Sequence, residues 1–163
     1  MGEGGSPKAN RVRAGNDRYT THMVPVRFSA RVITGSGRGK TLRVPTLNLD
    51  LRDVPDQIPD GVFACRVFLP SPSPTLSGAK GRRGGGAGGG GFPASMHKGN
   101  RPTFNDTPSC EVHVLDQVIG NPPKSLEVEV VQFLRRISTF PSAEALSTQM
   151  LEDNRQARDI LSA

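Results

Sequence analysis

Aromatic side chains and cysteines are scarce in this sequence. It has no tryptophan, one tyrosine and seven phenylalanines among 163 residues. Proteins that bind single-stranded nucleic acids usually present aromatic side chains on which the bases stack, so this class is disfavoured. The two cysteines, Cys65 and Cys110, stand in separate apolar runs and form no CxxC pair, which argues against structural zinc and a disulfide framework. We expect both to be small buried side chains in a reducing compartment.

Long apolar stretches are also missing. No run approaches the about 20 residues that a helix needs to cross a bilayer, and no hydrophobic segment follows the basic N-terminus as in a secretory signal. We therefore predict a cytoplasmic protein with no membrane partner. The length is that of one domain, and we expect a monomer.

Basic residues are concentrated at the N-terminal end. The net charge is +6, and residues 1–43 hold nine of the 21 Lys and Arg residues but only two of the 15 Asp and Glu residues. Such a cluster suits a partner that carries phosphate, either a nucleotide or a nucleic acid. A solvated basic tail that aids solubility explains residues 8–18 equally well.

The order of residue patterns predicts short strands followed by one helix. Apolar residues alternate with polar ones over 24–32, 110–115 and 126–130, and runs with strand character cover 61–69 and 92–100. After Pro141 the period changes, with Ser142 as the expected N-cap of a helix. Its apolar stripe comprises Leu146, Met150, Ala157, Ile160 and Leu161. This order predicts a mainly β fold, an antiparallel barrel with the helix packed outside.

Two segments are expected to lie outside the packed core. Residues 1–22 show no periodicity, which predicts a disordered basic tail ahead of a domain over 23–163. Residues 70–91 contain the runs PSPSP and GRRGGGAGGGG. Ordering so much glycine costs conformational entropy that little burial could offset, so we predict a flexible insertion without regular structure.

The run TGSGRGKT at 34–41 is rich in glycine but is not a P-loop. A P-loop would require glycine at Thr34 and a helix that begins at the lysine, whereas LRVPT follows here. The remaining turn offers backbone amides and two cations that could surround phosphates. An ordinary hairpin turn accounts for the same residues.

Thr46 and Asn48 are two residues apart in an extended segment, so their side chains lie on one face. A hydroxyl and an amide carbonyl are hard oxygen ligands of the kind that Mg²⁺ takes when it is shared with nucleotide phosphates. Without further context, both residues would be no more than surface polar groups.

Together these runs resemble the motifs of the riboflavin kinase family. GSGRGKTLRVPTLN at 35–48 resembles its nucleotide-binding signature, approximately G-x-G-R-G-x-x-L-G-[FIY]-P-T-A-N. Further resemblances follow in the family's order, from about residue 28 to 161. They are GVFA at 61–64, GNRPTF at 99–104, CEVHVLD at 110–116, FLR at 133–135, FPSAEAL at 140–146 and DNRQAR at 153–158.

The resemblance implies a six-stranded antiparallel Greek-key barrel and an enzyme that transfers the γ-phosphate of ATP to the 5′-hydroxyl of riboflavin, giving FMN and ADP. The expected cofactor is Mg²⁺ or another divalent metal, held by Thr46 and Asn48. Glu111 matches the glutamate that accepts the hydroxyl proton, and Arg135 matches an arginine near flavin and nucleotide; both are catalytic candidates. The implied ATP-binding residues are Gly35, Gly37, Arg38, Gly39, Lys40, Thr46 and Asn48.

The chain departs from the family pattern at three places. Arg43 replaces a glycine, Leu47 replaces an alanine, and Val118-Ile119-Gly120 lacks the aromatic residue of a turn. A flavin- or nucleotide-binding relative with weak catalysis is therefore one alternative, and a basic RNA-binding barrel is another, although we expect no nucleic-acid partner. The nucleotidyltransferase domain of bifunctional FAD synthetases has no counterpart in these residues, so FAD synthesis is not expected.

Overall fold

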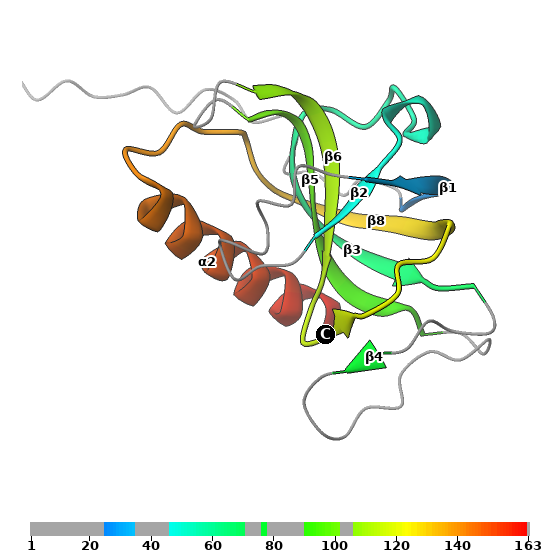
Figure 1. Ribbon diagram of the computed structural model, residues 1–163. Coiled ribbons are helices and arrows are strands. Elements are labelled where there is room, and N and C mark those ends of the chain that lie inside the picture. The colour runs from blue at the N-terminus through cyan, green and yellow to red at the C-terminus, as the bar shows by residue number, and fades with distance from the viewer. Residues whose placement is uncertain (1–24, 35–45, 71–75, 78–89, 102–105, 163) are drawn as a thin grey trace, which may run out of the picture.

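Six antiparallel strands close into a barrel in the computed structural model, in the order β1-β2-β6-β5-β3-β8 (Figure 1). The structure describes residues 25–34, 46–70, 76–77, 90–101 and 106–162. The barrel strands are β1 (Val26–Ile33), β2 (Leu47–Leu49), β3 (Gly61–Phe68), β5 (Phe92–Arg101), β6 (Asp106–Val114) and β8 (Ser125–Arg135). The predicted fold class, a six-stranded antiparallel Greek-key barrel with a C-terminal helix, is confirmed.

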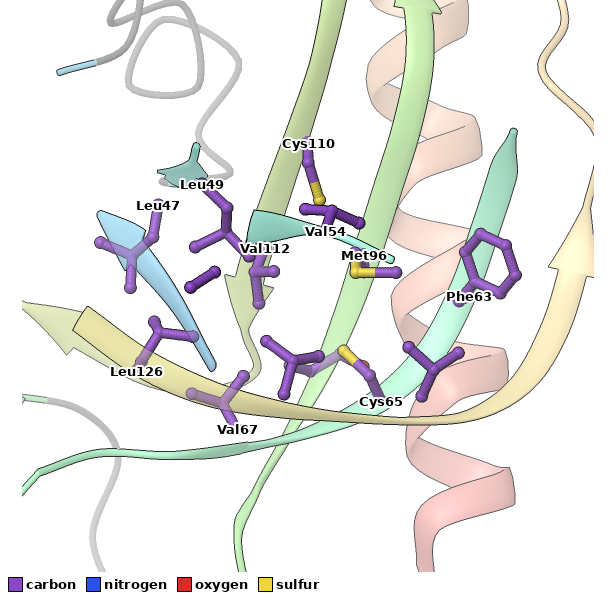
Figure 2. Close-up of a cluster of buried hydrophobic side chains, with 14 of the residues drawn as sticks. Leu47, Leu49, Val54, Phe63, Cys65, Val67, Met96, Cys110, Val112 and Leu126 are labelled. Carbon is purple, nitrogen blue, oxygen red and sulfur yellow. The ribbon is translucent and has the colours of Figure 1, made fainter. Parts of the chain in front are cut away.

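The alternation read from the sequence decides which side chains fill the barrel. On β8, Leu126, Val128 and Val130 are buried while the glutamates between them are not. This strand pairs with β1, where Ala30 is buried opposite Leu126. Figure 2 shows part of the resulting core, which also contains Phe63, Cys65, Val67, Met96, Cys110 and Val112.

Both cysteines are free and buried in this core, as predicted. Burial raises the pKa of the Cys110 thiol to about 12 and raises that of Cys65 further still. The thiolate is the reactive form of cysteine, so both side chains are chemically inert packing groups at neutral pH.

Helix α2 (Ala143–Ser162) lies along the outside of the barrel (Figure 1). Ser142 Oγ accepts a hydrogen bond from the backbone N–H of Ala145, at 3.2 Å, which confirms the predicted N-cap. Ala157 is buried against Ala64 of β3 and Leu115 in a second apolar cluster. Because the helix packs on β3 and β5, Val62 and Ala64 on the outer face of β3 are buried as well.

The insertion contains one element that the sequence did not reveal. Leu76–Ser77 form a short strand, β4, which pairs with β7 (Val118–Ile119) in a separate two-stranded sheet. The prediction that residues 70–91 hold no regular structure was therefore wrong at these two residues. Backbone pairing needs only free N–H and C=O groups, so it forms without the alternating pattern that marks longer strands.

Several predictions concern residues outside the described ranges, among them the tail at 1–22 and the turn at 35–40. Between η1 (Leu51–Asp53) and β3, the connector is more ordered than its polar composition indicated, because Val54 and Ile58 enter the core. Within the described ranges, no helix has the length and apolar character needed to cross a membrane.

Candidate active site

Three of the predicted site residues meet on the outer face of the barrel, where β2 lies beside β6. Asn48 is the cross-strand partner of Glu111, while their neighbours Leu47, Leu49, Cys110 and Val112 are buried in the core. Residues opposite each other on paired strands project to the same side, with Cβ atoms about 5 Å apart. Thr46, directly before β2, joins them, since its Oγ1 donates a hydrogen bond to Glu111 Oε2 at 3.4 Å.

The same row of cross-strand partners continues to the other catalytic candidate. His97 of β5 lies opposite Glu111, Val62 of β3 lies opposite His97, and Arg135 of β8 lies opposite Val62. Three strand spacings separate Glu111 from Arg135, which is about 14 Å measured along the curved wall of the barrel. The two catalytic candidates therefore lie at opposite ends of one row and do not contact each other.

Arg135 is held by the helix that covers the barrel. Its Nε and Nη2 donate to the two carboxylate oxygens of Asp153, at 2.8 and 2.7 Å, and its Nη1 donates to the carbonyl of Arg136 at 3.1 Å. The guanidinium also lies 5.5 Å from the ring centroid of Phe140. These bonds use three of the five N–H groups of a guanidinium and fix its plane, so any role of Arg135 toward a ligand starts from a preset orientation.

Gly61, at the start of β3, permits this arrangement. A Cβ atom at this position would come within 2.4 Å of the Phe133 ring and 3.0 Å of the Arg135 carbonyl oxygen. Any larger residue would push β8 away and move Arg135, so this close approach of two strands requires glycine.

The donor set around Glu111 suits a hard cation shared with phosphate. It consists of the Thr46 hydroxyl and the Asn48 amide, oxygen ligands that Mg²⁺ accepts while it keeps bonds to water and phosphates, and it lies beside the Glu111 carboxylate. Among the described residues, no three or more His, Cys, Asp or Glu side chains cluster in a way that could hold a metal ion without ligands from a nucleotide. The residues thus fit a divalent ion that arrives with a nucleotide.

A buried hydroxyl beside Glu111 has no hydrogen-bond partner among the described residues. Ser109 lies two residues before Glu111 on β6, so its side chain is on the same face, and it is paired with Gly99, which has no side chain. Within the described ranges, Ser109 Oγ is the one buried side-chain nitrogen or oxygen atom that forms no hydrogen bond. An unpaired buried hydroxyl is unfavourable, and a ligand or water at this position would satisfy it.

Sequence reasoning located Thr46, Asn48 and Glu111 but missed their surroundings. Asp153 was seen only as part of a motif, although its acidic side chain stands between Met150 and Ala157 on the apolar stripe of the helix. A charged residue on such a stripe signals a buried partner, and that signal was available. The predicted ATP-binding residues Gly35, Gly37, Arg38, Gly39 and Lys40 lie outside the described residues.

A model of the flavokinase family, described as riboflavin kinase, matches residues 22–161. The chain belongs to the riboflavin kinase family. Among curated relatives, the bifunctional riboflavin kinase/FMN adenylyltransferase of Haemophilus influenzae is 30% identical over 135 residues, and that of Escherichia coli K12 is 27% identical over 136 residues. These alignments cover 82% and 83% of the chain but 38% of each relative, so the chain spans about two fifths of their length.

Solved structures share the fold of this riboflavin kinase family member. The crystal structure of riboflavin kinase from Trypanosoma brucei has a TM-score of 0.50 at 18% identity, covering 86% of this chain and 82% of that one. A protein from Streptococcus pneumoniae that is described as a macrolide-efflux protein has a TM-score of 0.57 at 23% identity. Its alignment covers 83% of this chain and 39% of that one. At these identities the likeness concerns the fold alone.

Proposed function

We propose that the protein is a riboflavin kinase, which transfers the γ-phosphate of ATP to the 5′-hydroxyl of riboflavin and releases FMN and ADP. One observation carries the proposal beyond family membership. Thr46 and Asn48, at the start of and within one extended segment, lie beside Glu111 of another strand, which supports a metal–nucleotide site next to a carboxylate that acts as base.

Glu111 is the general base in this proposal. The hydroxyl oxygen of riboflavin forms a bond to the γ-phosphorus, the bond from that phosphorus to the bridging oxygen of ADP breaks, and the hydroxyl proton passes to the Glu111 carboxylate. Because phosphoryl transfer depends mainly on positioning and charge, one carboxylate that orients the hydroxyl is sufficient protein chemistry.

Thr46 and Asn48 are the residues that would hold the divalent metal, together with the phosphates. A bound Mg²⁺ neutralises charge on the phosphate oxygens. The hydrogen bond from Thr46 Oγ1 keeps the Glu111 carboxylate oriented along the β2–β6 seam. Gly35, Gly37, Arg38, Gly39 and Lys40 complete the proposed phosphate-binding segment by their match to the family signature.

Arg135 is assigned to the far end of the site. Its plane is fixed by two hydrogen bonds to Asp153, and its match to the family arginine near flavin and nucleotide supports this assignment. An oriented guanidinium suits charge that develops on transferred phosphate oxygens, because its N–H groups match their spacing.

The decisive experiment is incubation of the purified chain with riboflavin and ATP, with and without Mg²⁺, followed by chromatographic separation of FMN. We expect FMN only when a divalent metal is present. A lack of FMN above a protein-free control, across Mg²⁺, Mn²⁺ and Zn²⁺ and several nucleoside triphosphates, would refute the proposal. Flavin binding without turnover would instead identify a catalytically weak relative.

The setting of the reaction is also a proposal. Cys65 and Cys110 are both reduced and buried, which suits the reducing conditions of the cytoplasm. We propose that the chain acts there as a monomer on small-molecule substrates.

A further inference from the structure

Four charged side chains form a network at the end of β2. Asp50 follows this strand directly and comes two residues after Asn48. Its side chain is only 8% exposed, and its carboxylate accepts hydrogen bonds from Arg52 Nε at 2.9 Å and Nη2 at 2.6 Å. A third contact comes from Arg31, whose Nη2 lies 3.0 Å from Asp50 Oδ2.

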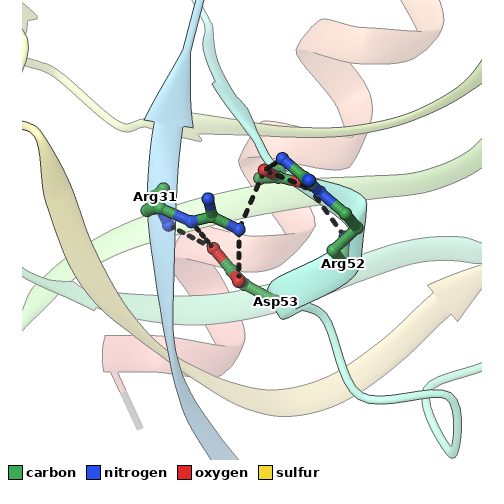
Figure 3. A network of polar contacts seen from close by, with 4 residues as sticks. Arg31, Arg52 and Asp53 are labelled. Atoms are coloured by element: carbon green, nitrogen blue, oxygen red, sulfur yellow. Dashed lines mark hydrogen bonds and ion pairs between the residues drawn. The ribbon is translucent and has the colours of Figure 1, made fainter.

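Arg31 connects this carboxylate to a second one. As Figure 3 shows, its side chain leaves β1 and reaches Asp53 of η1, with Nε to Oδ2 at 2.8 Å and Nη2 to Oδ1 at 3.0 Å. The backbone takes part too, because the Arg31 N–H donates to Asp53 Oδ2 at 2.9 Å and the Asp50 N–H donates to the Arg31 carbonyl at 3.0 Å. The network therefore ties β1, the end of β2 and η1 to one another.

The charges in the network are fixed at neutral pH. Hydrogen bonds from Arg52 lower the pKa of Asp50 to about 2, and the charge of Arg31 acts in the same direction. Hydrogen bonds from Arg31 lower the pKa of Asp53 as well. Both carboxylates are thus ionised and paired under the conditions in which the site would work.

β2 is a short strand held by few residues. It is three residues long; it pairs with β6 at all three residues, its Leu47 and Leu49 enter the core, and it shares two pairs of cross-strand partners with β1, Val32 with Leu49 and Ile33 with Asn48. A slip of one residue in such a strand turns every side chain to the other face. Asn48 would then point into the core instead of lying beside Glu111.

We propose that Asp50 is a positioning residue for the metal–nucleotide site: with Arg31, Arg52 and Asp53 it holds the register of β2, and so keeps Asn48 beside Glu111. That this register serves metal–nucleotide binding rests on the proposed kinase reaction, whereas the role of Asp50 in holding β2 does not depend on it. Asp50 has no role in the chemistry itself, because it faces two arginines.

The test compares Asp50→Asn with Glu127→Gln, a matched control. Glu127 forms an ion pair with Arg27 at 2.6 Å on the same barrel, but this pair joins β1 to β8 and both side chains are about half exposed. The first readout is amide hydrogen exchange at Leu47–Leu49, and the second is calorimetric titration with Mg-ADP. Steady-state kinetics provides the third.

In Asp50→Asn we expect faster exchange at β2 and binding of Mg-ADP weakened by about tenfold, the usual loss when a residue that orients a ligating group is removed. We expect kcat at saturating substrate to change by less than about threefold, because Glu111 is untouched. In Glu127→Gln all three readouts should match the wild type. If Asp50 contributed only to overall stability, Asp50→Asn would lower the unfolding temperature without an increase in amide exchange that is confined to β2.

Equal exchange at β2 in the two variants would overturn the inference, whatever the turnover. A wild-type chain that makes no FMN would overturn the proposed function, while the exchange comparison would still decide the positioning role. If Asp50→Asn does not fold, Arg52→Gln replaces it, since this arginine is 77% exposed and only supports Asp50. Faster exchange at β2 in Arg52→Gln than in Glu127→Gln then supports the inference, and equal exchange refutes it.

Discussion

Replacing Asp153 by asparagine should destabilise the protein strongly, because it removes the charge that binds Arg135 to the helix. The Asp153 side chain is 5% exposed and that of Arg135 is 23% exposed. Asp153 also accepts a hydrogen bond from Gln149 at 3.0 Å. The substitution keeps the size of the side chain but leaves a guanidinium without its counter-ion.

The size of the effect follows from the burial of the two partners. Breaking a fully buried ion pair by removing one partner costs about 3–5 kcal/mol. Because water reaches part of Arg135, we expect about 2–3 kcal/mol for Asp153→Asn. In urea, with a slope of about 2 kcal/mol per molar, the unfolding midpoint should fall by about 1–1.5 M.

Glu127→Gln again serves as the control, because its ion pair with Arg27 is exposed. Exposed pairs contribute less than about 1 kcal/mol, so the midpoint should move by less than about 0.5 M. Equal midpoint shifts in the two variants would refute the reasoning. A double-mutant cycle with Arg135→Gln gives an independent check, since additive losses would mean that Arg135 and Asp153 do not interact.

Three further predictions follow from the site, the charged network and the insertion. Glu111→Gln should lower kcat on the order of 10²-fold while flavin binding, followed by fluorescence titration, stays close to wild type; near-normal turnover would contradict the role of Glu111 as base. The pKa of Asp50 is lowered from 3.8 to about 2, so its contribution to stability is complete above pH 4 and is lost as the pH falls toward 2. Unfolding midpoints measured over this interval should fall more steeply in the wild type than in Asp50→Asn, and parallel curves would refute the assignment. Replacing residues 71–89 by a short turn should preserve folding and FMN formation, because a glycine-rich segment contributes little packing; a folded variant without turnover would show that the insertion reaches the substrates.

The barrel was largely predictable because one face of most strands is buried. Alternation along β1 and β8 identified the inward residues, and Ser142 marked the start of the helix. β3 was harder to interpret, since Val62, Phe63, Ala64 and Cys65 are all buried. A continuous apolar run predicts a strand covered on both faces, but nothing in it says that α2 is the cover.

The site was predictable only in part, for a physical reason. The spacing of Thr46 and Asn48 predicted a shared face, and the structure agrees. Local spacing does not encode that β6 lies beside β2, so the link to Glu111 depended on the resemblance to a family. Contacts such as Arg135 with Asp153 join residues from different elements, and only packing of the helix on the barrel creates them.

The seam between β2 and β6 has a consequence for how the protein folds. Thr46 and Glu111 are separated by 65 residues in the sequence, so the chain must close a long loop before they meet. Contacts of such large separation repay their entropic cost only after much of the chain is in place. Incompletely folded chains therefore lack the site. A ligand that bridges the two strands binds the closed barrel alone and shifts the folding equilibrium toward it by mass action. The amount of folded protein in a cell would then rise with the supply of its own substrates.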